Sequence, residues 1–336
     1  MSNSNSNSSP PSGGATTTTL SDLHSDILTT HILPLLDGPT LAAASCASSQ
    51  LHSLSTQPHL WSTLCHLTWP STSSSPRLRH LISSFPGGPH SFFSLSFPLL
   101  LLHPTTTSPP PNNLISAVDI HHNNHLIFSK LHETETESDW FRRSPFRVDL
   151  LDPKEAVPTT ATHPACDGAC ASLSSDITLS WILIDPVARQ AANLSSYRPV
   201  AVDRHWLTGE VRVSFAAALP GRRRRKEHVQ CGVVVTCGAS EGGEMVVREV
   251  SLQMEDMNGM HLTGEESLGI LHRAMEGKRA GNYKRREEEG RKRYKDYLEL
   301  KRERRERKLR NEGRLDKLCV ALLVALFAAW VFYPCF

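Results

Sequence analysis

Apolar residues in the segment 20–69 recur at helical spacing and then end on a Leu-Trp pair, which restricts this part of the chain to short amphipathic helices. Five of them lie about four residues apart along one helix face: Leu23, Ile27, Leu28, Ile32 and Leu36. Pro34 and the turn at 37–39 should end this helix, and Thr40 should cap a second helix that runs toward Leu54. Two such short helices cannot bury both apolar faces against each other, so the sequence predicts a partner surface.

The same segment resembles an F-box. The residues that carry the resemblance are Leu23, Asp26, Ile27, Leu28, Ile32, Leu33, Leu36, the turn at 37–39, Leu41, Cys46, Leu60 and Trp61. The aromatic residue that often follows that Cys is replaced by Ser48, Ser49 and Gln50. The resemblance implies that residues 20–69 dock onto the Skp-type adaptor, and through it the cullin, of a ubiquitin ligase. The implied contacts are Leu23, Ile27, Leu28, Ile32, Leu36, Pro39, Leu41, Leu60 and Trp61. The alternative is a helical hairpin that only packs on the rest of this protein.

The length and the cysteine usage set the class of protein. A chain of 336 residues allows one or two globular domains plus tails. Eight cysteines without a regular framework, and no signal peptide at the start, predict free thiols in a reducing compartment. The Ser/Asn-rich residues 1–19 should form a disordered arm.

The C-terminal part divides into a charged and an apolar segment. The formal net charge is only +2, but Lys and Arg concentrate in residues 278–317, which should form one long solvated helix. Residues 318–336 carry no charge, so we expect a transmembrane tail anchor behind Arg314 and Lys317, with the bulk of the protein in the cytosol. A nuclear-envelope or nuclear pool stays open as a location. A buried helix or a docking peptide is the alternative to the anchor. The basic helix should then face lipid headgroups, and we do not expect nucleic-acid binding.

The middle of the chain changes from helical to β-type patterns. Residues 70–113 should form helices and loops, and residues 114–277 a β-rich domain that recognises a protein substrate. The expected strands are 115–120, 126–131, 146–151, 180–185, 198–202, 210–215, 229–236 and 245–254. Many short strands without a βαβ rhythm predict an antiparallel sandwich. The fold class is therefore α+β, with an N-terminal helical module, a central antiparallel sandwich, a charged helix and a transmembrane helix.

This middle region also resembles a known group. The segments 181–186, 192–200, 204–210, 262–271 and 274–277 look like the C-terminal domain of plant F-box proteins that include the cytokinin-induced F-box proteins. A more distant resemblance to phloem-lectin-like sandwiches implies a carbohydrate-binding fold without proving a sugar site. The candidate ligand contacts are Trp181, Arg198, Arg204, His205 and Trp206. Each of these residues can alternatively be explained as core filling or as a strand-end polar group.

The sequence offers no catalytic constellation. His121, His122 and His125 are not paired with a nucleophile, and the spacings of the cysteine pairs 166/170 and 231/237 do not match a structural zinc site. We therefore expect a non-enzymatic chain without cofactor or metal. The predicted function is the substrate-recognition subunit of an SCF-type ligase, tethered to a membrane. The alternative is a membrane-anchored scaffold or lectin-like binding protein that acts without ligase partners.

Overall fold

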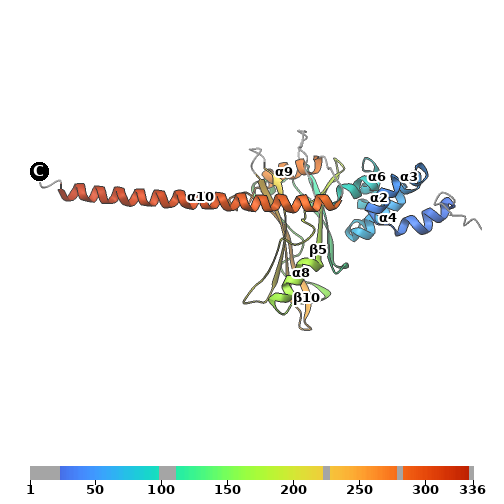
Figure 1. Cartoon of the computed structure of the whole chain (residues 1–336), viewed down its shortest axis with the longest axis horizontal. Helices are drawn as coiled ribbons and strands as arrows, with labels where there is room; N and C mark the ends of the chain where they lie inside the picture. The colour runs from blue at the N-terminus through green and yellow to red at the C-terminus, as the bar shows by residue number, and fades with distance from the viewer. Residues whose placement is uncertain (1–22, 98–110, 222–227, 278–282, 333–336) are drawn as a thin grey trace, which may run out of the picture. The chain divides into compact units, whose positions relative to one another are not determined.

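The computed structural model describes residues 23–97, 111–221, 228–277 and 283–332 (Figure 1). The predicted disordered arm 1–19 lies outside the described residues. The chain divides into two compact units, Met1–Leu64 and Cys65–Phe336.

The first unit is built from short helices. They are α1 Ser25–Ile27, the π-helix η2 Leu28–Ile32, the 3₁₀ helix η3 Leu33–Leu35, α2 Gly38–Ser45, α3 Ser49–Ser55 and the start of α4 Pro58–Thr68. The first helical run ends at Leu35, because Pro34 lies in its last turn and Leu36 is extended. Asp37 caps α2 in place of the expected Thr40, since the Asp37 carboxylate accepts a hydrogen bond of 2.9 Å from the Thr40 backbone N–H. In place of the single second helix that was expected, the structure has the two helices α2 and α3, and Ser48 caps α3.

The second unit contains a four-stranded antiparallel sheet in the order β2-β1-β5-β6. Its strands are β1 Asn113–His122, β2 His125–Glu135, β5 Ile177–Asp185 and β6 Gln190–Asn193. Trp181 to Ile184 are apolar throughout because β5 lies inside this sheet, paired with β1 on one side and β6 on the other.

The other sheet of this unit has six antiparallel strands. Their order is β3-β10-β9-β8-β7, and β4 also pairs with β10. The strands are β3 Arg147–Asp149, β4 Val157–Thr162, β7 Ala201–Arg204, β8 Val211–Pro220, β9 His228–Ala239 and β10 Glu244–Glu255. The expected alternation holds in β8, where Val211, Val213 and Phe215 are buried and Arg212 is exposed. Both sheets contribute to one hydrophobic core, which includes Trp181.

Short helices cover the outer face of the four-stranded sheet. They follow α4 as η4 Pro70–Ser73, α5 Pro76–Ser83 and α6 Gly88–Leu95. The indole of Trp69 donates a hydrogen bond of 3.2 Å to the Ser180 hydroxyl of β5 and packs against Phe92 and Phe93. The Ser71 backbone N–H donates to the buried Asp119 carboxylate of β1 over 2.9 Å. These contacts bind the helical layer firmly to the sheet.

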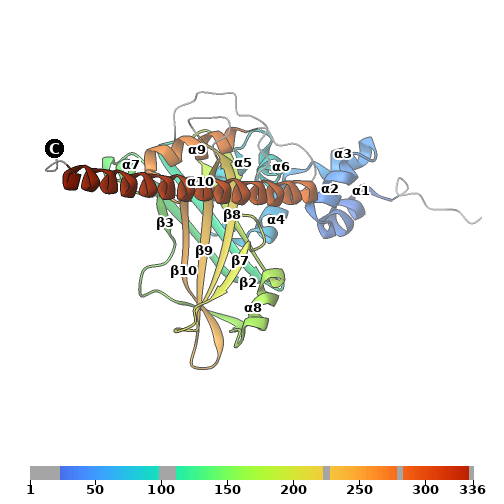
Figure 2. The same ribbon diagram turned by 60° about the vertical axis from the view of Figure 1, so that its left-hand side comes forward.

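The described residues of the second unit form four further helices. They are α7 Asp139–Arg143, α8 Asp167–Asp176, α9 Gly264–Glu276 and α10 Tyr283–Phe332. A capping box between Thr263 and Glu266 fixes the start of α9. In Figures 1 and 2, α9 and α10 run next to each other at one end of the strands, and α8 lies toward the other end. Tyr297 is almost fully buried and attaches α10 to this end of the unit.

The structure is α+β with antiparallel sheets, as expected, but the transmembrane part of the expected fold class is wrong. None of the helices in the described ranges combines the length and the apolar content that a bilayer crossing requires. The helix α10 is long, yet its uncharged part within the described chain runs only from Leu318 to Phe332, short of the roughly 20 residues needed. The prediction of a single-pass membrane protein with a C-terminal anchor is corrected accordingly.

Candidate functional site

The first unit exposes apolar side chains on the segment 23–39. Ile27 is 44% exposed, Pro39 is also exposed, and Leu23, Ile32 and Leu36 are half-buried. Exposed aliphatic groups on a small helical unit are available to a partner protein, and burying one stabilises a complex by about 1.5–3 kcal/mol. Five of the nine residues predicted to contact an adaptor are thus accessible.

The other four predicted contact residues lie in the interior. Leu28 and Leu41 are each only 1% exposed, and Leu60 and Trp61 are also buried. The Trp61 indole donates a hydrogen bond of 2.7 Å to the carbonyl oxygen of Ser55, the last residue of α3. This bond joins α4 to α3. The four buried residues therefore hold the helices of the first unit together and support the segment 23–39.

Sequence reasoning missed Leu35, which is 84% exposed. Leu35 falls outside the four-residue spacing that selected the other positions, because the chain tightens from a π-helix to a 3₁₀ helix between Leu28 and Leu35. The signal that could have found it is the Pro34-Leu35-Leu36 run, since a proline inside an apolar helix face shifts the register of the residues that follow.

The cap of α2 fixes the far end of this segment. The hydrogen bonds from Thr40 lower the pKa of the Asp37 carboxyl, so this cap is ionised at neutral pH. A negative charge at a helix N-terminus also interacts favourably with the helix dipole. Pro39, one residue before Thr40, is therefore held in a defined position.

The second candidate surface is the turn between β7 and β8. Trp206 is 87% exposed, and its ring stacks on that of His205 with a centroid distance of 6.5 Å and an interplanar angle of 24°. The His205 Nδ1 accepts a hydrogen bond of 3.1 Å from the Thr208 backbone N–H, and Gly209 has the positive φ of 70° that closes the turn. The turn thus presents an aromatic pair to solvent in one conformation.

Charged residues flank this aromatic pair. Arg204 is exposed at the end of β7, and the Arg248 guanidinium of β10 pairs with the Glu210 carboxylate over 2.8 Å. Arg248 also lies close over Gly238, because a Cβ there would come within 2.6 Å of its Nε, so a larger residue would have to displace this half-exposed side chain. Arg198 is exposed on the segment that precedes β7.

Trp181 does not belong to this surface. It is fully buried in the shared core, and its indole donates a hydrogen bond of 3.2 Å to the Ser116 hydroxyl of β1. The structure thus brings Arg204, His205 and Trp206 together on one turn and places Trp181 in the packing of the sandwich.

The described residues hold no group of three or more His, Cys, Asp or Glu side chains that could bind a metal ion. His121 is half-buried, and desolvation lowers its pKa. Burial raises the pKa of the Cys231 and Cys237 thiols to about 12, so neither is a ready nucleophile.

Known proteins resemble this chain over most of its length. A probable F-box protein from Arabidopsis thaliana is 44% identical, over 93% of this chain and 94% of the relative. This chain belongs to the F-box proteins. Two further F-box proteins from the same plant are 40% identical over 94% of the chain and 44% identical over 84% of it, and the matches cover 96% and 80% of those relatives.

The similarity of this F-box protein to its relatives extends beyond the N-terminal helices, because each match covers at least 84% of the chain. The β-rich unit therefore belongs to the shared architecture. The relatives' names give no subgroup, so the narrower resemblance to cytokinin-induced F-box proteins stays a prediction. No family model matches the chain. No solved structure matches it either.

Proposed function

We propose that this F-box protein is the substrate-recognition subunit of an SCF-type cullin-RING ubiquitin ligase, and that it belongs to the cytokinin-induced group. The segment 23–39 binds the Skp-type adaptor, which connects the chain to the cullin. The observation that carries this proposal is the division of the first unit into a buried set, such as Leu28 and Leu41, and an exposed apolar set, such as Ile27 and Leu35.

The contribution of such a subunit to ubiquitin transfer is proximity. A target held by the β-rich unit meets the ubiquitin-loaded enzyme at a raised effective concentration, so this chain needs no catalytic group of its own. We place target contacts on the turn between β7 and β8, where Trp206, His205 and Arg204 are exposed. Aromatic and Arg side chains are enriched among the residues that dominate protein interfaces, which supports this choice.

Adaptor binding is tested by co-purification of the adaptor and the cullin with the tagged chain. The double variant Ile27→Asp/Leu35→Asp places two charges on the exposed apolar set and should abolish recovery of both partners. Val187→Asp is the matched control, because Val187 is 80% exposed in a turn of the second unit. Recovery of the adaptor with the double variant at the unmutated level would refute the proposed docking segment.

Carbohydrate binding is the second candidate function, favoured by the exposed aromatic face of Trp206. Sugar rings commonly stack on such faces, and neighbouring polar groups then orient them. The test is binding of the purified chain to a glycan array. Binding that disappears with Trp206→Ala supports this function, and no binding by the unmutated chain removes it.

A further inference from the structure

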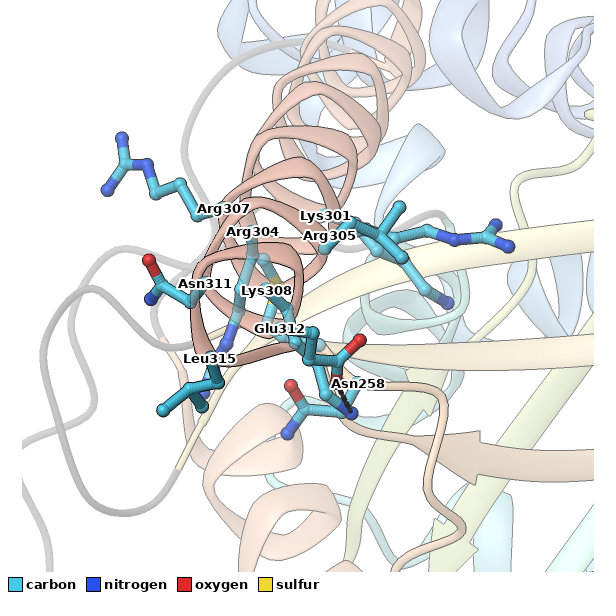
Figure 3. A pocket seen from close by; sticks show the side chains of 11 residues that line it. Asn258, Lys301, Arg304, Arg305, Arg307, Lys308, Asn311, Glu312 and Leu315 are labelled. Atoms are coloured by element: carbon cyan, nitrogen blue, oxygen red, sulfur yellow. Dashed lines mark ion pairs between the residues drawn. The ribbon is translucent and has the colours of Figure 1, made fainter. Parts of the chain in front are cut away.

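A basic groove of about 690 Å³ lies between α10 and the loop that follows β10 (Figure 3). The loop contributes Met257 and Asn258, and α10 contributes Lys301, Arg304 and Arg305 from its exposed middle part. Neither candidate surface described above includes this groove.

The loop wall of the groove is held in one conformation. The Asp256 Oδ1 accepts hydrogen bonds of 2.8 Å from the backbone N–H groups of both Asn258 and Met260, and Gly259 has the positive φ of 80° that the turn requires. The hydroxyl of the buried Tyr297 donates to the Asp256 carbonyl oxygen over 3.4 Å. The groove is therefore formed before any ligand arrives, which lowers the entropy cost of binding.

The charge of the groove is strongly positive. Of the described residues that line it, five are cationic and one, Glu312, is acidic. Three of the cations have acidic partners: Lys301 pairs with Glu255, Arg307 with Glu303 and Lys308 with Glu312. Figure 3 marks the last of these pairs and shows Arg307 directed away from Asn258.

Arg304 and Arg305 differ from those three cations. Neither has an ion-pair partner in the part of the chain that the structure describes. A guanidinium group donates two parallel hydrogen bonds to a carboxylate, and this geometry makes Arg the preferred partner of acidic side chains. Leu309, Leu315 and Met257 add apolar contacts to the same groove.

We propose that this groove binds an acidic peptide segment that carries an apolar residue beside its carboxylates. The carboxylates pair with Arg304 and Arg305, and the apolar side chain packs on Leu309 and Leu315. This inference rests on the proposed function, since the segment would belong to the ligase target. None of the described residues that line the groove has an aromatic side chain on which a nucleobase could stack, so a peptide fits it better than single-stranded RNA.

The experiment measures binding of a fluorescent peptide of alternating glutamate and leucine to the full chain. A peptide with glutamine in place of glutamate and a single-stranded RNA oligonucleotide are the competitors. The test variant is Arg304→Ala/Arg305→Ala. The matched control is Arg302→Ala/Arg310→Ala, which removes the same charge from α10 at residues outside the groove, each paired with Glu306.

The test variant should weaken binding of the acidic peptide at least tenfold, and the control less than threefold. The glutamine peptide should compete poorly. Equal loss in both variants, binding of RNA tighter than of the peptide, or no binding of the peptide at millimolar concentration would each overturn the inference. Adaptor co-purification with the same variants separates the two proposals, because the groove variant should retain the adaptor even where peptide binding is lost.

Discussion

The buried carboxylate of Asp119 gives the sharpest test of how the helical layer is attached to the sandwich. Asp119 is fully buried and accepts hydrogen bonds from the Ser71 backbone N–H, the Ser71 hydroxyl and the Ser129 hydroxyl. Replacement by Ala leaves the Ser71 N–H without an acceptor, which costs about 1–3 kcal/mol, and also removes two hydroxyl contacts of about 0.5–1.5 kcal/mol each. These losses amount to about 2–6 kcal/mol, but the substitution also removes a carboxylate whose desolvation is unfavourable, so Asp119→Ala should destabilise the second unit by about 3 kcal/mol.

Asp119→Asn is the control for this prediction. The amide oxygen can replace Oδ1, which accepts from the Ser71 N–H and the Ser129 hydroxyl, while the amide NH₂ can donate to the Ser71 hydroxyl. We expect the free energy of unfolding of this variant to lie within about 1 kcal/mol of that of the unmutated chain. A loss of about 3 kcal/mol corresponds to a fall in Tm of roughly 6–12 °C for a domain of this size, measured by the fluorescence of the buried tryptophans.

The same pair of variants has a pH signature. Burial raises the pKa of Asp119 in the folded state, although the hydrogen bonds from Ser71 and Ser129 partly oppose this effect. The native state then binds a proton that the unfolded chain releases, so the contribution of Asp119 to stability is present at low pH and is lost as pH rises through the folded pKa. The difference between the Tm of the unmutated chain and the Tm of Asp119→Asn should therefore shift in favour of the unmutated chain as pH falls from 7 toward 4. Two results would refute this reasoning: an Ala variant within 1 kcal/mol of the unmutated chain, or an Asn variant as unstable as the Ala variant.

Two further predictions concern packing and thiol chemistry. Gly264→Ala should destabilise the second unit by about 2 kcal/mol or more, measured by urea unfolding, because a Cβ there would lie 2.2 Å from the Phe141 carbonyl oxygen; an unchanged midpoint would contradict this. Cys46 and Cys166 are exposed and should react with a thiol reagent at pH 8 within minutes, as measured by mass spectrometry. Cys231 should react only after unfolding, because burial raises its pKa to about 12. Labelling of Cys231 in the folded chain within minutes would contradict its buried position.

The antiparallel character of the second unit could be read from the sequence because its strongest strands show simple patterns. The alternation from Val211 to Phe215 identified a half-exposed strand, and the apolar run at 181–184 identified an interior one. The strands β4 and β6 were not expected. β4 contains Pro158 and three threonines and, among the described strands, pairs only with β10; β6 is only four residues long, so neither produces a clear period.

The sequence selects residues for the candidate site but does not show which of them are exposed. Helical spacing selected Ile27 and Leu28 together, and only the folded unit shows that one is 44% exposed and the other 1%. The four-residue spacing does not include Leu35, because a fixed spacing does not follow the change from π-helix to 3₁₀ helix. Trp181 shows the limit for ligand sites, because an aromatic residue in a strand looks the same in sequence whether its ring faces the core or a ligand.

The uncharged end of α10 has the hydropathy of a membrane span but not its length. Hydropathy of the tail from Leu318 suggested a membrane span, but the uncharged helix in the described chain is shorter than a bilayer crossing requires. The charged residues before it lie in the same helix, which runs without interruption from Tyr283 to Phe332. Its role in forming a groove with the loop after β10 depends on the buried Tyr297, whose burial no local pattern indicates.

Calorimetric titration of the purified full chain with a purified Skp-type adaptor tests the central claim most directly. The proposed function predicts one-to-one binding that Ile27→Asp/Leu35→Asp weakens at least a hundredfold, which corresponds to about 3 kcal/mol for two aliphatic contacts. The Val187→Asp control should bind like the unmutated chain. Absence of binding by the unmutated chain, or equal affinity of the double variant, would contradict the assignment of the segment 23–39 as the adaptor-binding surface.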